Sequence, residues 1–220
     1  MPYPRITLKL ATSLDGRIAT ASGESRWITG EAARAEVQTL RGAHDAVMIG
    51  AETARRDDPS LLVRADPEAL QPARIVLTSR FDIPCEGKLF DGLDQSPLIV
   101  FGVENANPAR QAILEGAGAR VETVPAAEAG VDIAAVLARL DELNFGSILA
   151  EGGGKLAASL IAADAVTRIE WFRAPLVLGA EGKSAVAALA IAGLANAPRY
   201  RRVALRELGP DMWESYERVS

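Results

Sequence analysis

The chain opens with alternating side chains and continues with short apolar runs. Residues 6–14 alternate apolar and polar positions, which indicates a strand with one buried face. Four later runs have the pattern of strands buried on both faces, and they are Ala46–Gly50, Arg74–Thr78, Leu98–Phe101 and Ser147–Ala150. Helical patterns lie between them, notably over Pro108–Glu115 and Ile133–Leu143. Strands that alternate with helices predict βα crossovers and a mostly parallel sheet.

The last third of the chain has a different pattern. Val166–Phe172 and Tyr200–Leu208 are predicted strands, and the turn residues 209–211 followed by Met212–Val219 predict a final hairpin. An antiparallel edge on the parallel sheet would result. The alanine-rich residues 185–197 indicate a short helix and a loop. No internal repeat or linker divides the sequence, so we expect a single α/β domain over residues 1–220.

A helix is predicted over Gly30–Arg41, between two strands of the sheet. Thr29 is the expected N-cap and Gly42 the expected stop signal. The following Asp57-Asp58-Pro59 is either a carboxylate pair near a site or an ordinary loop in which the proline restrains Asp58.

Composition and charge narrow the classes of function. The 220 residues are 49% hydrophobic and carry a net charge of −5, which argues against broad nucleic-acid or membrane-surface binding. The longest apolar runs fall well short of a membrane span, and no secretion signal opens the sequence, so we expect a cytoplasmic protein. One histidine (His44, expected in a solvated turn) and one cysteine (Cys85) cannot build the usual zinc site, although an oxygen-only magnesium site stays open. We therefore expect no metal.

A glycine-rich turn joins a predicted strand to a predicted helix at residues 150–160. Glycines let the backbone approach a ligand closely, and the free amides of a helix start attract phosphate. Gly152, Gly153 and Gly154 fit this use, but they fit a tight strand-to-helix turn equally well. Leu156 stands where a P-loop needs Ser or Thr, and the spacing is not that of a dinucleotide fingerprint either.

Polar side chains gather between the first strand and residue 64. Lys9 lies in mid-strand, where a lysine is expected only if its face lines a cleft. Ser25, Arg41 and Arg64 offer a hydroxyl and two guanidinium groups, which suit a phosphate monoester, although each alone is typical of a surface.

These segments together resemble a known family. Residues 8–17 and 22–29, then Val37–Arg41, residues 50–53 and 57–64, and Glu151 with its three glycines, resemble in order the reductase half of the bacterial riboflavin-biosynthesis deaminase/reductase. The resemblance spans essentially the whole chain. It implies a dihydrofolate-reductase-like three-layer fold, NADPH as cofactor and homodimerisation. The implied substrate is a small phosphorylated ribosylaminopyrimidine whose ribosyl group is reduced to ribityl.

The resemblance also implies roles for single residues. The residues implied to contact the cofactor are Ala11, Trp27, Thr53, Asp57, Ser79, Gly153, Gly154, Lys155, Leu156, Ala157, Ala158 and Ser159, with Thr78 as the alternative to Ser79. The residues implied to contact the substrate are Ser25, Arg41, Leu61, Arg64 and Glu151. Lys9 and Glu151 are the candidate catalytic pair, able to contact the pyrimidine or to manage a proton.

The sequence departs from the bifunctional pattern in one respect. It lacks the His-x-Glu and Pro-Cys-x-x-Cys motifs of the family's zinc deaminase domain, which predicts a stand-alone reductase or a domain cut from a longer protein. The pyrimidine could be the diamino or the amino-dioxo form. Two alternatives stay open: a dihydrofolate or pterin reductase, and a non-catalytic nucleotide-binding relative.

Overall fold

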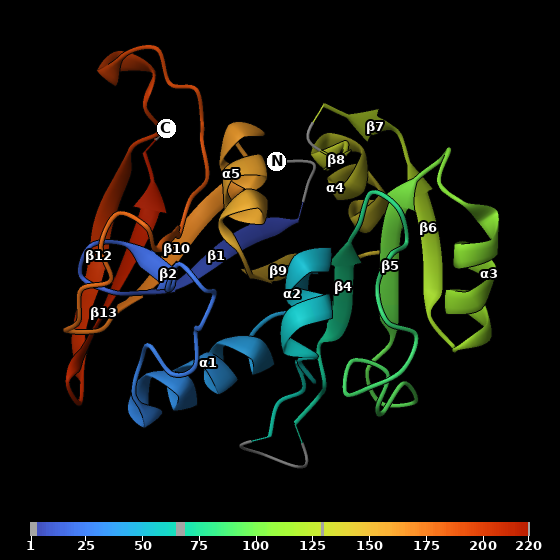
Figure 1. The fold of residues 1–220 in the computed structure, drawn as a ribbon, viewed down its shortest axis with the longest axis horizontal. Helices are drawn as coiled ribbons and strands as arrows, with labels where there is room; N and C mark the ends of the chain where they lie inside the picture. The colour runs from blue at the N-terminus through green and yellow to red at the C-terminus, as the bar shows by residue number, and fades with distance from the viewer. Residues whose placement is uncertain (1–3, 65–68, 129, 220) are drawn as a thin grey trace. The chain divides into compact units, whose positions relative to one another are not determined.

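The computed structural model describes residues 4–64, 69–128 and 130–219, which form two compact units. We call residues 39–149 the middle unit, and residues 5–38 with residues 150–219 the terminal unit. The prediction of a single domain stays a prediction. Each unit contains strands and helices of its own, so the α/β class follows for both (Figure 1).

The middle unit is built on parallel strands linked by helices. Its strand order is β9-β3-β4-β5-β6, and the pairs β3–β4, β4–β5 and β5–β6 are parallel. The strands are β3 (Ala46–Gly50), β4 (Ala73–Leu77), β5 (Leu98–Val103), β6 (Arg120–Val124) and the start of β9 (Ser147–Glu151), with the small pair β7 (Ala126–Ala127) and β8 (Gly130–Val131). The helices are α2 (Ala51–Asp57), α3 (Pro108–Gly116) and α4 (Ile133–Glu142). The predicted strand and helix alternation is therefore confirmed here.

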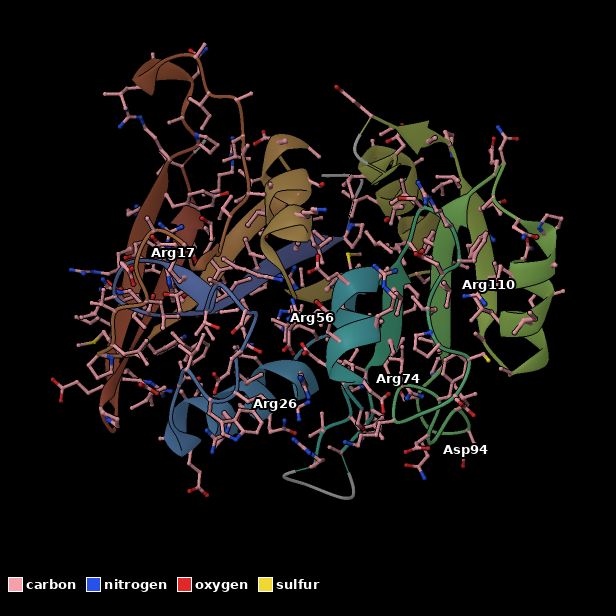
Figure 2. All side chains as sticks on the ribbon, viewed as in Figure 1. Arg17, Arg26, Arg56, Arg74, Asp94 and Arg110 are labelled. Carbon is pink, nitrogen blue, oxygen red and sulfur yellow. The ribbon has the colours of Figure 1, made fainter. Side chains whose placement is uncertain are left out.

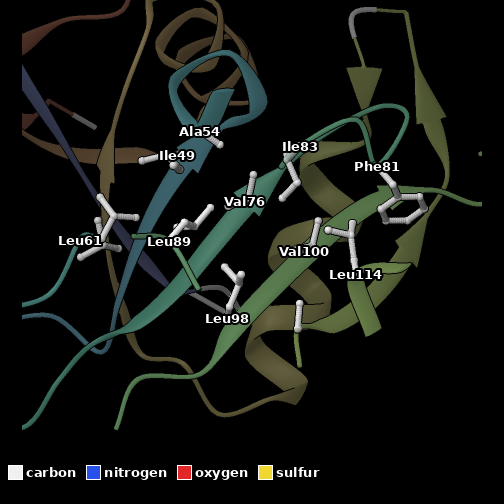
Figure 3. Close-up of a cluster of buried hydrophobic side chains, with 12 residues drawn as sticks. Ile49, Ala54, Leu61, Val76, Phe81, Ile83, Leu89, Leu98, Val100 and Leu114 are labelled. Carbon is white, nitrogen blue, oxygen red and sulfur yellow. The ribbon is translucent and has the colours of Figure 1, made fainter. Parts of the chain in front are cut away.

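One hydrophobic cluster holds the middle unit together (Figure 3). It joins side chains of β3, β4 and β5 to residues from the connecting segments, among them Leu61, Phe81 and Leu89. Gly102 must be glycine because a Cβ there would overlap the Phe81 ring. Burial of this apolar surface is the main stabilising contribution.

A fully buried arginine ties a long loop to this cluster. Arg74 of β4 donates hydrogen bonds to the carbonyls of Leu89 (2.7 Å), Asp91 (2.8 Å) and Ser96 (Figure 2). Burial lowers the pKa of its guanidinium, and the charge of Asp91 opposes that shift. Arg74 therefore orders the 89–96 segment through the backbone.

The terminal unit places an antiparallel edge beside a parallel pair. Its strand order is β12-β13-β10-β1, in which β1 and β10 are parallel while β13 is antiparallel to both of its neighbours. The strands are β1 (Arg5–Thr12), β2 (Arg17–Ala19), β10 (Val166–Arg173), β11 (Lys183–Ser184), β12 (Tyr200–Leu208) and β13 (Asp211–Arg218). The helices are α5 (Gly154–Ala162) and the start of α1 (Glu31–Gly42). The predicted C-terminal hairpin is confirmed.

Three local predictions need correction. In residues 185–197 the predicted short helix is reduced to a single 3-10 turn, η1 (Leu194–Asn196), and the rest of the segment is loop. Asp57 closes helix α2 instead of lying in a loop, and Asp58 ends that helix in the left-handed region at φ 39°. His44 is half-buried, and its Nδ1 lies 2.7 Å from the Leu40 carbonyl, so it is not a solvated turn histidine.

Candidate active site

Lys9 and Glu151 form an ion pair within the terminal unit. The Lys9 Nζ lies 3.3 Å from the Glu151 Oε2, and the two side chains are 16% and 9% exposed. Lys9 comes from the middle of β1 and Glu151 from the last position of β9. A lysine is tolerated in a half-buried strand because the carboxylate compensates its desolvation. β1 and β9 are neighbouring strands, and the structure brings these two candidate residues into contact, while their catalytic role stays a prediction.

The glycine loop follows Glu151 directly and starts helix α5. Gly152 has φ 148°, a backbone conformation that L side chains rarely adopt, and Gly153 occupies the N-cap with φ −78°. Since glycine has no side chain, nothing from the N-cap residue covers the first amides of α5. These amides, together with the positive end of the helix dipole, suit an anion such as a phosphate.

The side chains of residues 155–159, which the resemblance implies as cofactor contacts, differ in their exposure. Lys155 is exposed and Ser159 half-buried, whereas Leu156, Ala157 and Ala158 turn their side chains into the core. Those three residues could meet a ligand only through backbone atoms. Their burial has a second effect, because it anchors the first turn of α5 firmly.

A short strap lies over the glycine loop, and the sequence gives no sign of it. We define the strap as residues 183–187. Its Ala187 amide donates to the Gly154 carbonyl (2.9 Å), and the Arg17 guanidinium donates to the Ser184 hydroxyl (2.5 Å). A Cβ at Gly154 would lie 2.5 Å from the Ser184 carbonyl oxygen, so a side chain there would push the strap away. The strap explains why the third glycine is needed.

The Ser25–Trp27 segment lies between β2 and α1. Ser25 is half-buried, and the Trp27 side chain is 68% exposed. The Arg34 guanidinium lies over the Trp27 ring, 4.6 Å from its centroid, and donates to the Thr29 carbonyl at 2.8 Å. A shallow, open depression of about 390 Å³ lies beside this segment, with Trp27, Arg34 and Asp211 among its lining residues.

Asp211 is the main residue of this region that sequence reasoning missed. It was expected only as a turn residue after Gly209 and Pro210, yet its carboxylate is 2% exposed and accepts a hydrogen bond from the Gly30 amide at 2.6 Å. Helix α1 begins at Glu31, so Gly30 and not the expected Thr29 directly precedes it, and the Asp211 carboxylate reaches this helix start from β13. No local spacing could reveal a partner 181 positions away.

Six implied contacts belong to the middle unit, and one of them is restricted by burial. Leu61 is 2% exposed in the hydrophobic cluster and has φ 60°. Its side chain therefore cannot touch a substrate, and only its backbone could. The other five are Arg41 in the last turn of α1, Thr53 and Asp57 on α2, and the exposed Arg64 and Ser79. Because Ser25 belongs to the terminal unit while Arg41 and Arg64 belong to the middle unit, the phosphate clamp stays a prediction.

The choice between Ser79 and Thr78 depends on which hydroxyl is accessible. Thr78 is 3% exposed and donates its hydroxyl hydrogen to Asp82 (2.9 Å), whereas Ser79 is exposed. This geometry favours Ser79 as the implied contact. For the metal question, no cluster of three or more His, Cys, Asp or Glu side chains with ligand geometry occurs within the described ranges. None of the helices in those ranges has the length and apolar content of a membrane span.

Comparisons with known proteins give a consistent answer. The model of the RibD C-terminal domain family matches residues 4–213. The riboflavin biosynthesis protein RibD of Actinobacillus pleuropneumoniae is 33% identical over 219 residues, covering 99% of this chain and 57% of that protein. Among solved structures, Acinetobacter baumannii RibD has a TM-score of 0.85 at 26% identity, covering 100% of this chain and 59% of that one. Dihydrofolate reductase from Enterococcus faecalis, complexed with NADP(H), has a TM-score of 0.56 at 15% identity, covering 99% of each chain.

The match covers nearly all of this sequence but a limited part of its relatives. The chain spans 56–57% of the length of the first bacterial RibD proteins that it resembles. The structural likeness to both RibD and dihydrofolate reductase confirms the expected fold class. The chain belongs to the RibD C-terminal domain family.

Proposed function

We propose that this chain reduces the ribosyl group of 5-amino-6-(5-phosphoribosylamino)uracil, or of its 2,5-diamino-pyrimidinone precursor, to the ribityl form with NADPH. Family membership supports the riboflavin-pathway reduction, and the uncapped start of α5 supports a phosphate-bearing cofactor. The observation that carries the chemistry is the Lys9–Glu151 ion pair beside the glycine loop. We further propose a cytoplasmic homodimer in which residues 1–220 form one reductase domain.

The fit of the nicotinamide cofactor rests on this chain's own residues. NADPH, when bound, supplies a hydride from nicotinamide C4 to C1′ of the ring-opened imine, and the imine nitrogen takes up a proton. The amides at the start of α5 would hold a cofactor phosphate, and the 68% exposed Trp27 ring offers a flat apolar surface. The implied contacts of Ala11, Thr53, Asp57 and Ser79 belong to the same proposal.

The proposed role of Lys9 follows from its partner. Glu151 orients the Lys9 ammonium, so that Lys9 can contact the pyrimidine or hold a proton near the reduced nitrogen. Ser25, Arg41 and Arg64 would bind the substrate phosphate, and the binding energy of this remote group would orient C1′ toward the cofactor.

Purified protein tests the proposed reaction directly. NADPH absorbance should fall when either pyrimidine form is present and should stay constant with dihydrofolate. No turnover with either pyrimidine would overturn the proposal, while turnover of dihydrofolate would make the chain a reductase of another class. Mass spectrometry of the product should show the gain of two hydrogens.

The phosphate clamp has its own test. Arg41→Ala should raise the KM for the pyrimidine about tenfold or more while changing the KM for NADPH little, because a charge-assisted bond to phosphate is lost. Arg110→Ala, at an exposed position of α3, is the matched control (Figure 2). Equal changes in both KM values for Arg41→Ala would mean that the phosphate assignment is wrong.

A further inference from the structure

A buried carboxylate at the start of β13 has an unusual partner. Asp211 is 2% exposed, and within the described part of the chain its carboxylate forms no ion pair with Lys or Arg. It accepts instead from the Gly30 amide, at 2.6 Å. Gly30 directly precedes helix α1, so the negative charge lies at the positive end of that helix.

Asp211 reinforces the start of α1 from outside the helix, because its carboxylate accepts from the amide of the residue that precedes the helix. Gly30 has no side chain to accept from the first amides, and a Cβ added there would lie 3.4 Å from the Asp211 Oδ2. The hairpin turn that ends in Pro210 brings the carboxylate to this point. A buried, charged acceptor on a backbone amide is a strong and directional contact.

Arg34 links the Asp211–Gly30 contact to Trp27. The Arg34 amide donates to the Gly30 carbonyl (3.2 Å), and the Arg34 guanidinium donates to the Thr29 carbonyl (2.8 Å). The same guanidinium lies 4.6 Å from the centroid of the Trp27 ring. Asp211, Arg34 and Trp27 also line the same shallow depression of about 390 Å³. The position of the exposed indole thus depends on where α1 begins.

We propose that Asp211 is a positioning residue for the cofactor site. By holding the start of α1, it holds Arg34, and Arg34 holds the Trp27 indole in the orientation that meets the ligand. Asp211 itself need not touch the cofactor. This inference rests on the proposed function only for the role of Trp27 in NADPH binding.

The variants are Asp211→Ala, which removes the acceptor, and Asp211→Asn, which keeps an acceptor oxygen. Glu214→Gln is the matched control, because Glu214 is an equally buried carboxylate of β13 (3% exposed) whose partners are Arg173, Arg202 and Tyr216. Acrylamide quenching of tryptophan fluorescence reports the exposure of Trp27, and Trp27→Phe assigns its share of the signal. Steady-state kinetics give KM for NADPH and kcat.

Asp211→Ala should change Trp27 quenching and raise the KM for NADPH about tenfold, as expected for loss of a helix cap, while kcat changes little. Asp211→Asn should restore most of both values, and Glu214→Gln should leave both near wild type. Wild-type quenching and KM in Asp211→Ala would overturn the inference, as would the same shifts in Glu214→Gln. Quenching is measured without ligand, so it judges this inference even if the proposed reaction is wrong.

Discussion

Two adjacent glycines of the glycine loop should respond differently to substitution by alanine. A Cβ at Gly154 would lie 2.5 Å from the Ser184 carbonyl oxygen and 3.1 Å from the Ala187 nitrogen. A Cβ at Gly153 would have no neighbour within 4 Å, and φ −78° is an ordinary backbone angle for alanine. Gly154→Ala should therefore damage the fold, and Gly153→Ala should damage ligand binding.

The expected magnitudes follow from these contacts. Gly154→Ala overpacks the strap, at roughly 1–3 kcal/mol, and weakens the Ala187–Gly154 hydrogen bond, at about 1 kcal/mol. The melting temperature should fall by roughly 10 °C for a chain of this size. For Gly153→Ala, reduced entropy of the unfolded chain stabilises by about 0.4–1 kcal/mol, and a poorer N-cap residue costs a similar amount. Its stability should stay close to wild type.

Binding separates the two variants. In Gly153→Ala the new methyl group occupies the space before the amides of α5, so the Kd for NADPH should rise at least tenfold, or about 1.4 kcal/mol. Thermal unfolding without ligand and fluorescence titration with NADPH measure the two effects independently. Wild-type affinity in Gly153→Ala would refute a phosphate at the start of α5. Wild-type stability in Gly154→Ala would refute the tight packing of the strap.

Three further predictions concern charged groups. Lys9→Met and Glu151→Gln should each lower kcat about a hundredfold. The double variant should be little worse than either single variant, because the two side chains act as a pair. Additive losses in a double-mutant cycle would contradict this prediction. Arg74→Met should lower the free energy of unfolding by about 3–5 kcal/mol, because buried carbonyls lose their hydrogen-bond donor. Urea denaturation measures this loss, and the control Arg110→Met should show no comparable loss. Hydrogen bonds from the Ser13 hydroxyl, and then from the Leu178 and Gly179 amides, lower the pKa of Asp15 from 3.8 to about 2. The Asp15 carboxylate therefore stabilises the fold above pH 3.8, and this contribution to stability is lost as the pH falls through 2. The melting temperatures of Asp15→Asn and wild type should accordingly converge on acidification, and a constant gap down to pH 2 would show that the charge plays no part.

The sequence pattern was sufficient to predict those elements that are determined by residues close to one another in the chain. A run such as Ala46–Gly50, which is short and apolar throughout, favours a strand buried on both faces, and the structure has that strand. Strand β6 was missed because residues 120–124 mix charged and apolar side chains, and its pairing with β5 is what makes it a strand. Residues 185–197 were expected to be partly helical from composition, but helix formation in a protein depends on a face to bury.

The candidate site shows the same division. The glycine loop, Lys9 and the two arginines could be named from the sequence, since glycine, lysine and arginine carry their chemistry with them. The Lys9–Glu151 ion pair, the strap over Gly154 and the Asp211 contact with Gly30 were decided by tertiary structure. The ion pair and the Asp211 contact join positions more than a hundred residues apart, and the strap reaches Gly154 from beyond α5 and β10 in the chain. Such contacts depend on strand order and hairpin geometry, which no local spacing encodes. The sequence by itself thus determined which chemical groups the protein has, and only the folded chain decided which of them meet.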